Sequence, residues 1–172
     1  MIVNGWAEFR ADFPDDYVEE DGEIVQFGGK AIAEAVADML GGFGCVVEAV
    51  ANRHQNGWWC DFAYERLALR FQVVDLGDEC LLIFHEPHRA TRKISRYGEA
   101  LMKLNQCLRQ DGRFHDLIWY NYDGRNPRKN PSDVPVIGGL TEEEDADSDD
   151  RWLDDRKKLS FLEKLLAPLR RR

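Results

Sequence analysis

Apolar and polar residues alternate along the middle of the chain, which is the period of a β-strand with two different faces. The alternation is strict from Trp58 to Glu65 and continues from Leu67 to Val74. Turn-forming residues, above all Asn56-Gly57 and a Leu-Gly-Asp sequence at 76–78, separate these segments from two apolar runs. The four predicted strands are 45–51, 58–65, 67–74 and 80–85. Connections this short join only antiparallel neighbours, so we predict a four-stranded meander.

Three other segments carry apolar residues three or four positions apart, which is the period of a helix. The first is followed by Gly41-Gly42, a predicted left-handed C-cap, and the second begins near Ser95 and stops at Asp111-Gly112. The predicted helices are 30–40, 95–110 and 151–167, and 114–122 is a predicted fifth strand that pairs with an edge of the meander. The predicted fold class is α+β, a four-stranded antiparallel meander plus a fifth strand, with two to three helices packed mainly on one face.

The remaining segments show neither period and predict the limits of the domain. Residues 1–27 are acidic and rich in turn formers, which predicts an irregular N-terminal arm with one or two short strands, held to the body by aromatic residues. Residues 28–125 form the predicted core domain. Residues 126–150 form a Pro-rich and acidic linker, with a loop at 126–135. Residues 151–172 form a C-terminal amphipathic helix that either folds back onto the sheet or docks elsewhere.

The charge is concentrated in two segments of the 172-residue chain. Its formal net charge is −9, yet residues 12–23 and residues 142–150 hold seven acids each and no base, which leaves 18 acids against 23 bases elsewhere. A hydrophobic fraction of 44% is sufficient for a core. The longest apolar run, Cys80–Phe84, is too short to span a bilayer, and no secretory signal precedes the first strand. We expect a cytoplasmic protein that binds neither membranes nor nucleic acid, because the acidic segments repel polyanions.

No residue pattern in the chain has the spacing of a catalytic or metal site. Four cysteines are spread 15 to 27 residues apart, which favours free thiols over disulfides. His85-Glu86-Pro87-His88 lacks the ligands that would complete a tetrahedral zinc site, and the proline forbids a helix there. The glycine pairs lack the spacing of a phosphate-binding loop. We therefore expect no catalytic residue, no metal and no cofactor.

Trp58 and Trp59 are adjacent on an alternating strand, so their rings must face opposite sides of the sheet. One ring fills the core. The other lies, with Asp61, on the second face, where either the protein's own segments or a partner protein covers it. Tryptophan is over-represented at binding hot spots, so Trp59 is a candidate partner contact.

Two stretches carry a family resemblance. One is the order of a helix, a Gly-rich turn, a Val-rich strand and Asn56-Gly57-Trp58, and the other is the sequence Phe114–Tyr120 after a leucine-striped helix. In element order and aromatic placement, residues 27–122 resemble small acidic bacterial immunity proteins, which protect against secreted toxins. The resemblance implies a cytosolic, non-catalytic protein that blocks a toxin's active site with acidic side chains against a basic cleft. It implies no catalytic residue.

Clustered carboxylates accelerate association with a basic partner, and aromatic side chains then add affinity. We therefore predict an immunity protein whose partner is another protein, a cognate toxin or a secreted effector. The predicted partner-binding residues are Asp15, Asp16, Glu19, Glu20, Trp59, Asp61, Glu142, Glu143 and Glu144. The alternative function is an acidic secretion chaperone of the type III kind, which holds an effector as a homodimer. Monomer and homodimer stay open, and so does a purely solubilising role of the acidic segments.

Overall fold

The computed structural model of the chain describes residues 2–52, 57–65, 67–85, 94–121 and 128–138. Within these residues the fold is α+β, with two helices, one large antiparallel sheet and two small two-stranded sheets. In chain order the elements are β1 (Ile2–Val3), β2 (Trp6–Ala11), β3 (Val18–Glu20), β4 (Glu23–Gln26), α1 (Lys30–Gly42), β5 (Val46–Val47), β6 (Ala51–Asn52), β7 (Trp58–Tyr64), β8 (Leu67–Asp75), β9 (Cys80–His85), α2 (Ile94–Gln110), β10 (Phe114–Asn121), β11 (Lys129–Ser132) and β12 (Val136–Ile137).

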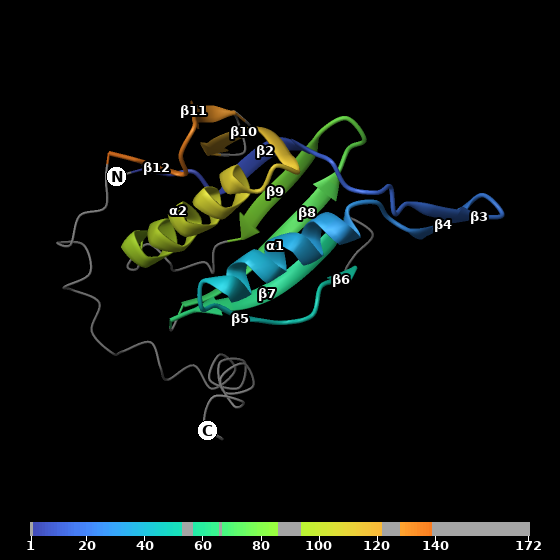
Figure 1. The fold of residues 1–172 in the computed structure, drawn as a ribbon, viewed down its shortest axis with the longest axis horizontal. Helices are drawn as coiled ribbons and strands as arrows, with labels where there is room; N and C mark the ends of the chain where they lie inside the picture. Colours follow the sequence, from blue (N-terminus) through green and yellow to red (C-terminus); the bar gives the residue numbers. More distant parts are fainter. Residues whose placement is uncertain (1, 53–56, 66, 86–93, 122–127, 139–172) are drawn as a thin grey trace, which may run out of the picture.

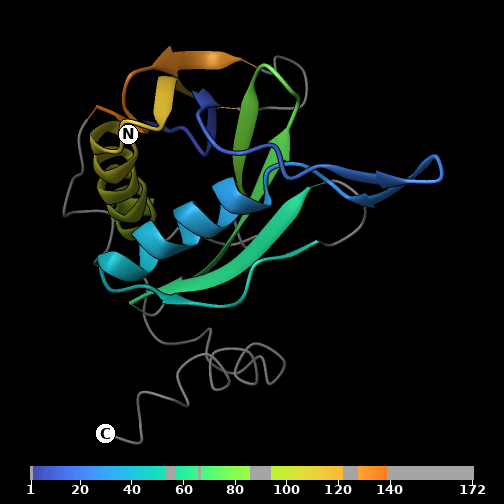
Figure 2. The ribbon, with the colours of Figure 1, turned by 45° about the vertical axis from the view of Figure 1, so that its right-hand side comes forward.

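The large sheet has the strand order β11-β10-β2-β9-β8-β7-β5, and β6 also pairs with β7. The sheet curls, and both helices lie in its hollow (Figures 1 and 2). Curling around the helices lets a single sheet enclose the core between its helix-facing side and the two helices.

The predicted meander is present as β7, β8 and β9, with β5 and β6 in place of its first strand. Trp58 lies opposite Val73 and Tyr64 opposite Leu67, in an unbroken antiparallel register. The helix-facing residues of β7 are at most 8% exposed, as the alternation predicted. The segment 45–51 was predicted as one strand, but only two short stretches, β5 and β6, pair with β7.

The prediction that the fifth strand pairs with an edge of the meander is wrong, because β2 lies between β9 and β10. Both neighbours run antiparallel to β2, so β9 and β10 run parallel to each other. Parallel strands need a long crossover connection, and α2 lies within that connection. Residues 6–11, which form β2, occupy the position between β9 and β10. This part of the expected irregular N-terminal arm is therefore a central strand, and its Ala7 and Phe9 are at most 1% exposed.

Both helices within the described residues were predicted. Along α2 the residues Tyr97, Leu101, Leu104 and Leu108 form the buried stripe, each at most 1% exposed. Helix α1 continues through the predicted cap, because Gly41 and Gly42 are helical and the left-handed residue is Gly44, with a φ of 97°. Predicted helix 151–167 lies outside the described residues.

The predicted loop at 126–135 contains, in its described part, the edge strand β11. Its Pro131 is compatible with this position, because an edge strand has one side whose N–H groups need no partner. Beyond it, β12 pairs with β1, where Val3 lies opposite Val136. Within the described residues, no helix is long and apolar enough to cross a membrane.

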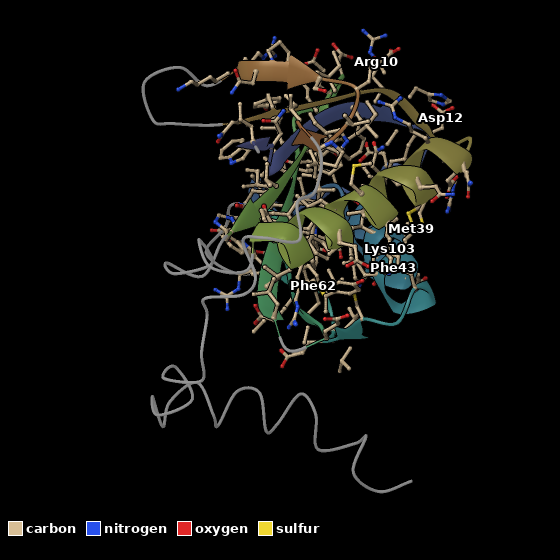
Figure 3. The ribbon with its side chains drawn as sticks, turned by 90° about the vertical axis from the view of Figure 1, so that its left-hand side faces the viewer. Arg10, Asp12, Met39, Phe43, Phe62 and Lys103 are labelled. Carbon is tan, nitrogen blue, oxygen red and sulfur yellow. The ribbon has the colours of Figure 1, made fainter. Side chains whose placement is uncertain are left out.

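The helices meet the sheet through a mixed apolar and polar contact at one end of the core. The Tyr64 ring packs edge-on against Phe43, at 6.2 Å between ring centres, and its hydroxyl contacts Glu99 and Lys103 of α2. Figure 3 shows Phe43 and Lys103 together at this end, with Arg10 at the opposite end of the view. The prediction of free thiols is confirmed for all four cysteines, and Cys45, Cys60 and Cys80 are buried.

Candidate protein-binding surface

The β3–β4 hairpin projects from the body of the protein, away from both helices (Figures 1 and 2). Its turn is Asp21-Gly22, and both residues have positive φ, 51° and 82°. Two such residues form the type I′ turn that matches the twist of paired strands, which explains why Asp-Gly closes a hairpin here. None of the seven residues of the two strands is buried.

The hairpin exposes apolar and acidic side chains together. Tyr17, Val18, Ile24 and Val25 are 39–59% exposed, and they account for four of the seven large hydrophobic residues exposed within the described part of the chain. Glu19 lies opposite Ile24, and Glu20 lies opposite Glu23. Like charges directly opposite on paired strands repel, so the free hairpin carries an electrostatic cost that a cationic partner would relieve.

The acidic side chains of the hairpin have no cationic partner within the described residues. No Lys or Arg there forms an ion pair with Glu19, Glu20, Asp21 or Glu23. Glu19 accepts a hydrogen bond from the Tyr17 hydroxyl at 3.0 Å, and this bond raises the pKa of Tyr17. The negative field of the hairpin is therefore directed outward.

Asp16 fixes the base of the hairpin to the start of α1. Its two carboxylate oxygens accept hydrogen bonds from the backbone N–H groups of Gly29 and Ala31, each at 2.7 Å. Gly29, the residue before α1, has no side chain to cap the helix, so Asp16 supplies the acceptor from 13 positions earlier. The Gln26 side chain donates a hydrogen bond to the Asp16 carbonyl. This network sets the direction in which the hairpin leaves the body.

A groove of about 640 Å³ lies where the hairpin meets the ends of β8 and β9. Tyr17, Ile24 and Phe27 line its hairpin side, and Val74 and Ile83 line its sheet side. Leu76, at 59% exposure, lies in the β8–β9 turn beside the groove residues Asp75 and Gly77. The exposed apolar surface of the hairpin thus continues into a concave surface on the body.

The structure separates the predicted binding residues into two groups. Asp15, Asp16, Glu19 and Glu20 lie at the hairpin. Trp59 and Asp61 lie on the face of β7 turned away from the helices. Glu142, Glu143 and Glu144 lie outside the described residues, so nothing places the second acidic segment.

On β7 the two predicted residues already have partners within the chain. Trp59 stacks on His85 at 4.6 Å between ring centres, and Arg70 lies over the Trp59 ring at 5.9 Å. Asp61 is 4% exposed and is held by Arg70 through two hydrogen bonds, one from Nε and one from Nη2 at 3.1 Å. Asp61 raises the pKa of Arg70, whereas burial and Arg70 lower the pKa of His85. This face therefore offers no unpaired carboxylate at Asp61.

Sequence reasoning missed the apolar half of the hairpin. Val18, Ile24 and Val25 flank an Asp-Gly pair, the same kind of turn signal that located the β7 strand at Asn56-Gly57. The Asp-Gly pair with these flanking residues is the local signal from which the hairpin is predictable.

The described residues contain no group of three or more His, Cys, Asp or Glu side chains placed to hold a metal ion. Of residues 85–88 only His85 is described, and its Nε2 forms a hydrogen bond with the Gln72 side-chain oxygen at 3.2 Å. No family model, no curated protein and no solved structure matches this chain.

Proposed function

We propose that this chain is a non-catalytic binding protein of the immunity type, which inhibits a basic partner protein by inserting the β3–β4 hairpin into its active-site cleft. The observation that supports this proposal is the projecting hairpin itself, which carries exposed apolar side chains next to carboxylates without a cationic partner in the described chain. An exposed apolar patch on a soluble domain marks an interaction site.

The two kinds of side chain have separate roles in this proposal. The carboxylates attract the basic cleft over a distance of about one Debye length, ~8–10 Å, and raise the rate of association. Tyr17, Ile24 and Val25 then remove apolar area from water and slow dissociation. Asp16 holds the hairpin in one direction, which lowers the entropy lost on binding.

The test is affinity capture from a lysate of the source cell, with the full chain as bait and mass spectrometry of the bound protein. The informative variant is Glu19→Gln/Glu20→Gln. The matched control is Glu34→Gln/Asp38→Asn, which removes two exposed charges from α1. We expect wild type and control to recover the same basic protein, the hairpin variant to lose it, and binding to weaken as salt is raised.

Two outcomes would contradict the proposal. Recovery of the same partner by the hairpin variant would place the interface elsewhere. A homodimer by light scattering that binds an unfolded effector segment would favour the secretion chaperone instead. Inhibition of the recovered protein's activity by stoichiometric amounts of wild type is the final measurement.

A further inference from the structure

The groove at the base of the hairpin combines apolar walls with carboxylates. Asp15 and Asp75 both line it, and no Lys, Arg or His belongs to its lining within the described residues. Neither carboxylate forms an ion pair with a described Lys or Arg. The cavity therefore presents two negative charges that the described part of the protein does not neutralise.

Both carboxylates are oriented by the backbone. Asp75 accepts a hydrogen bond from the Gly77 N–H at 2.8 Å, and Asp15 accepts one from the Tyr17 N–H at 3.0 Å. In each case the hydrogen bond from the described backbone is made to Oδ1, and within the described part of the chain Oδ2 accepts no hydrogen bond. Preoriented acceptors lose little entropy when a ligand binds.

Two glycines that line the groove allow other parts of the chain to approach the backbone closely. A Cβ on Gly28 would lie 2.5 Å from Oδ2 of Asp75, and a Cβ on Gly57 would lie 2.2 Å from the Val73 carbonyl oxygen. Any other residue at Gly28 would therefore displace the Asp75 carboxylate. Gly28 therefore leaves room for the Asp75 carboxylate at the groove.

We propose that this groove receives an arginine side chain of the partner protein, an inference that rests on the proposed function. A guanidinium group fits three features of the groove: its carboxylates, its aromatic rings and its aliphatic side chains. Its planar N–H donors match carboxylate oxygens, its flat face stacks on aromatic rings such as Tyr17 and Phe27, and its apolar stem packs on Val74 and Ile83. A lysine ammonium group is more strongly hydrated and does not stack in this way.

The experiment uses the full ¹⁵N-labelled chain and three short peptides as probes. They are acetyl-Gly-Arg-Gly-amide, the same peptide with lysine, and the same peptide with citrulline, which keeps the shape of arginine without its charge. The amide signals of Gly28, Gly57 and Gly77 report on the groove. We expect the arginine peptide to shift these signals, with at least tenfold weaker binding of the citrulline peptide and clearly weaker binding of the lysine peptide.

The variant Asp75→Asn removes the charge but keeps an oxygen acceptor for the Gly77 N–H, so the turn is preserved. We expect it to bind the arginine peptide at least tenfold more weakly than wild type. The control is Asp78→Asn, an exposed acid in the same turn that does not line the groove. Unchanged binding in Asp75→Asn, equal binding of arginine and citrulline peptides, or no shift at the three glycines would each overturn the inference.

The two proposals fail separately. Peptide binding to the groove is measured without the partner protein. Its result is therefore independent of what the affinity capture recovers. If Glu19→Gln/Glu20→Gln fails to capture the partner but the arginine peptide does not bind the groove, the hairpin interface is supported and only the arginine site is contradicted.

Discussion

Two of the antiparallel strand pairs, β7–β8 in the large sheet and β3–β4 in the hairpin, differ sharply in how far they are buried. In β7–β8 the helix-facing residues from Trp58 to Val73 are at most 8% exposed, whereas β3–β4 has no buried residue. The first pair is stabilised by the area it buries, roughly 25 cal/mol for each Å² of apolar surface. The second has almost no such contribution and is held by its turn, its ladder and Asp16. The difference shows that one pair supports the fold, while the other is free to contact a partner.

The largest effect that separates the two regions is expected for Phe71→Ala. Phe71 is 0% exposed and forms a triangle of rings with Phe62 and Phe84, in which each pair of ring centres is 6.2 Å apart. The cavity should lower the free energy of unfolding by about 3–5 kcal/mol in urea titrations. The control Val25→Ala, on the hairpin, should lower it by less than about 0.5 kcal/mol. Equal losses would contradict the comparison.

The next effect is expected for Arg70→Met. The variant keeps the length of the side chain but removes the Arg70 cation from the buried Asp61 carboxylate, and we expect a loss of about 2–3 kcal/mol. The exposed pair of Arg113 and Asp111 provides the control, because Arg113→Met should cost less than about 1 kcal/mol. A second substitution, Asp61→Leu, should restore most of the stability of Arg70→Met, and failure to do so would show that the packing of Arg70 matters more than the ion pair.

A smaller effect is expected from alkaline pH, through two buried thiols of the core. Burial raises the pKa of Cys45 and of Cys80 from the ordinary value of 9.0 to about 12. Between these values the unfolded thiols lose their protons while the folded ones keep theirs, so stability is complete below pH 9 and falls as the pH rises. We expect the free energy of unfolding to fall by roughly 1 kcal/mol for each thiol between pH 8 and 9.5. In Cys45→Ala/Cys80→Ala this part of the pH dependence should disappear.

Asp16→Ala tests the joint between the two regions. Loss of the hydrogen bonds to Gly29 and Ala31 should lower the free energy of unfolding by about 1 kcal/mol, the usual cost of losing a helix cap. The control is Asp38→Ala, which removes an exposed acid from α1 and should lower the free energy of unfolding by less. Amide exchange of residues 18–26 should accelerate in Asp16→Ala only, and unchanged exchange would mean that other contacts orient the hairpin.

The smallest effect on stability, and the sharpest test of the comparison, is expected for Ile24→Thr/Val25→Thr. Both side chains are exposed, so the free energy of unfolding should change by less than about 0.5 kcal/mol. Affinity for the protein recovered by capture should nevertheless fall at least tenfold, as measured by calorimetry. A large loss of stability would instead assign the hairpin a structural role.

Much of the fold follows from local patterns. Residues 58–74 alternate with a period of two, and residues 95–110 carry a stripe of leucines. Such patterns show which side of an element is buried, and with the three- and four-residue spacing in 30–40 they made the meander and both described helices predictable. Strand β2 was not, because its inward residues include Ala7 and Ala11, whose small side chains give little contrast with Glu8 and Arg10. Within the candidate site, the acids of the hairpin were predicted, but its apolar residues and the groove were not.

The sequence by itself determined the local elements, the two acidic segments and the Asp-Gly turn, because these depend on neighbours a few residues apart. Only the tertiary structure decided that residues 6–11 separate β9 from β10, and that Asp75 and Tyr17 line the same groove. It also decided that Asp61 is paired with Arg70, whereas Glu19, Glu20 and Glu23 are exposed and form no ion pair with a described Lys or Arg. Long-range pairing has no periodic signature in the chain, because it is fixed by which surfaces can be buried together.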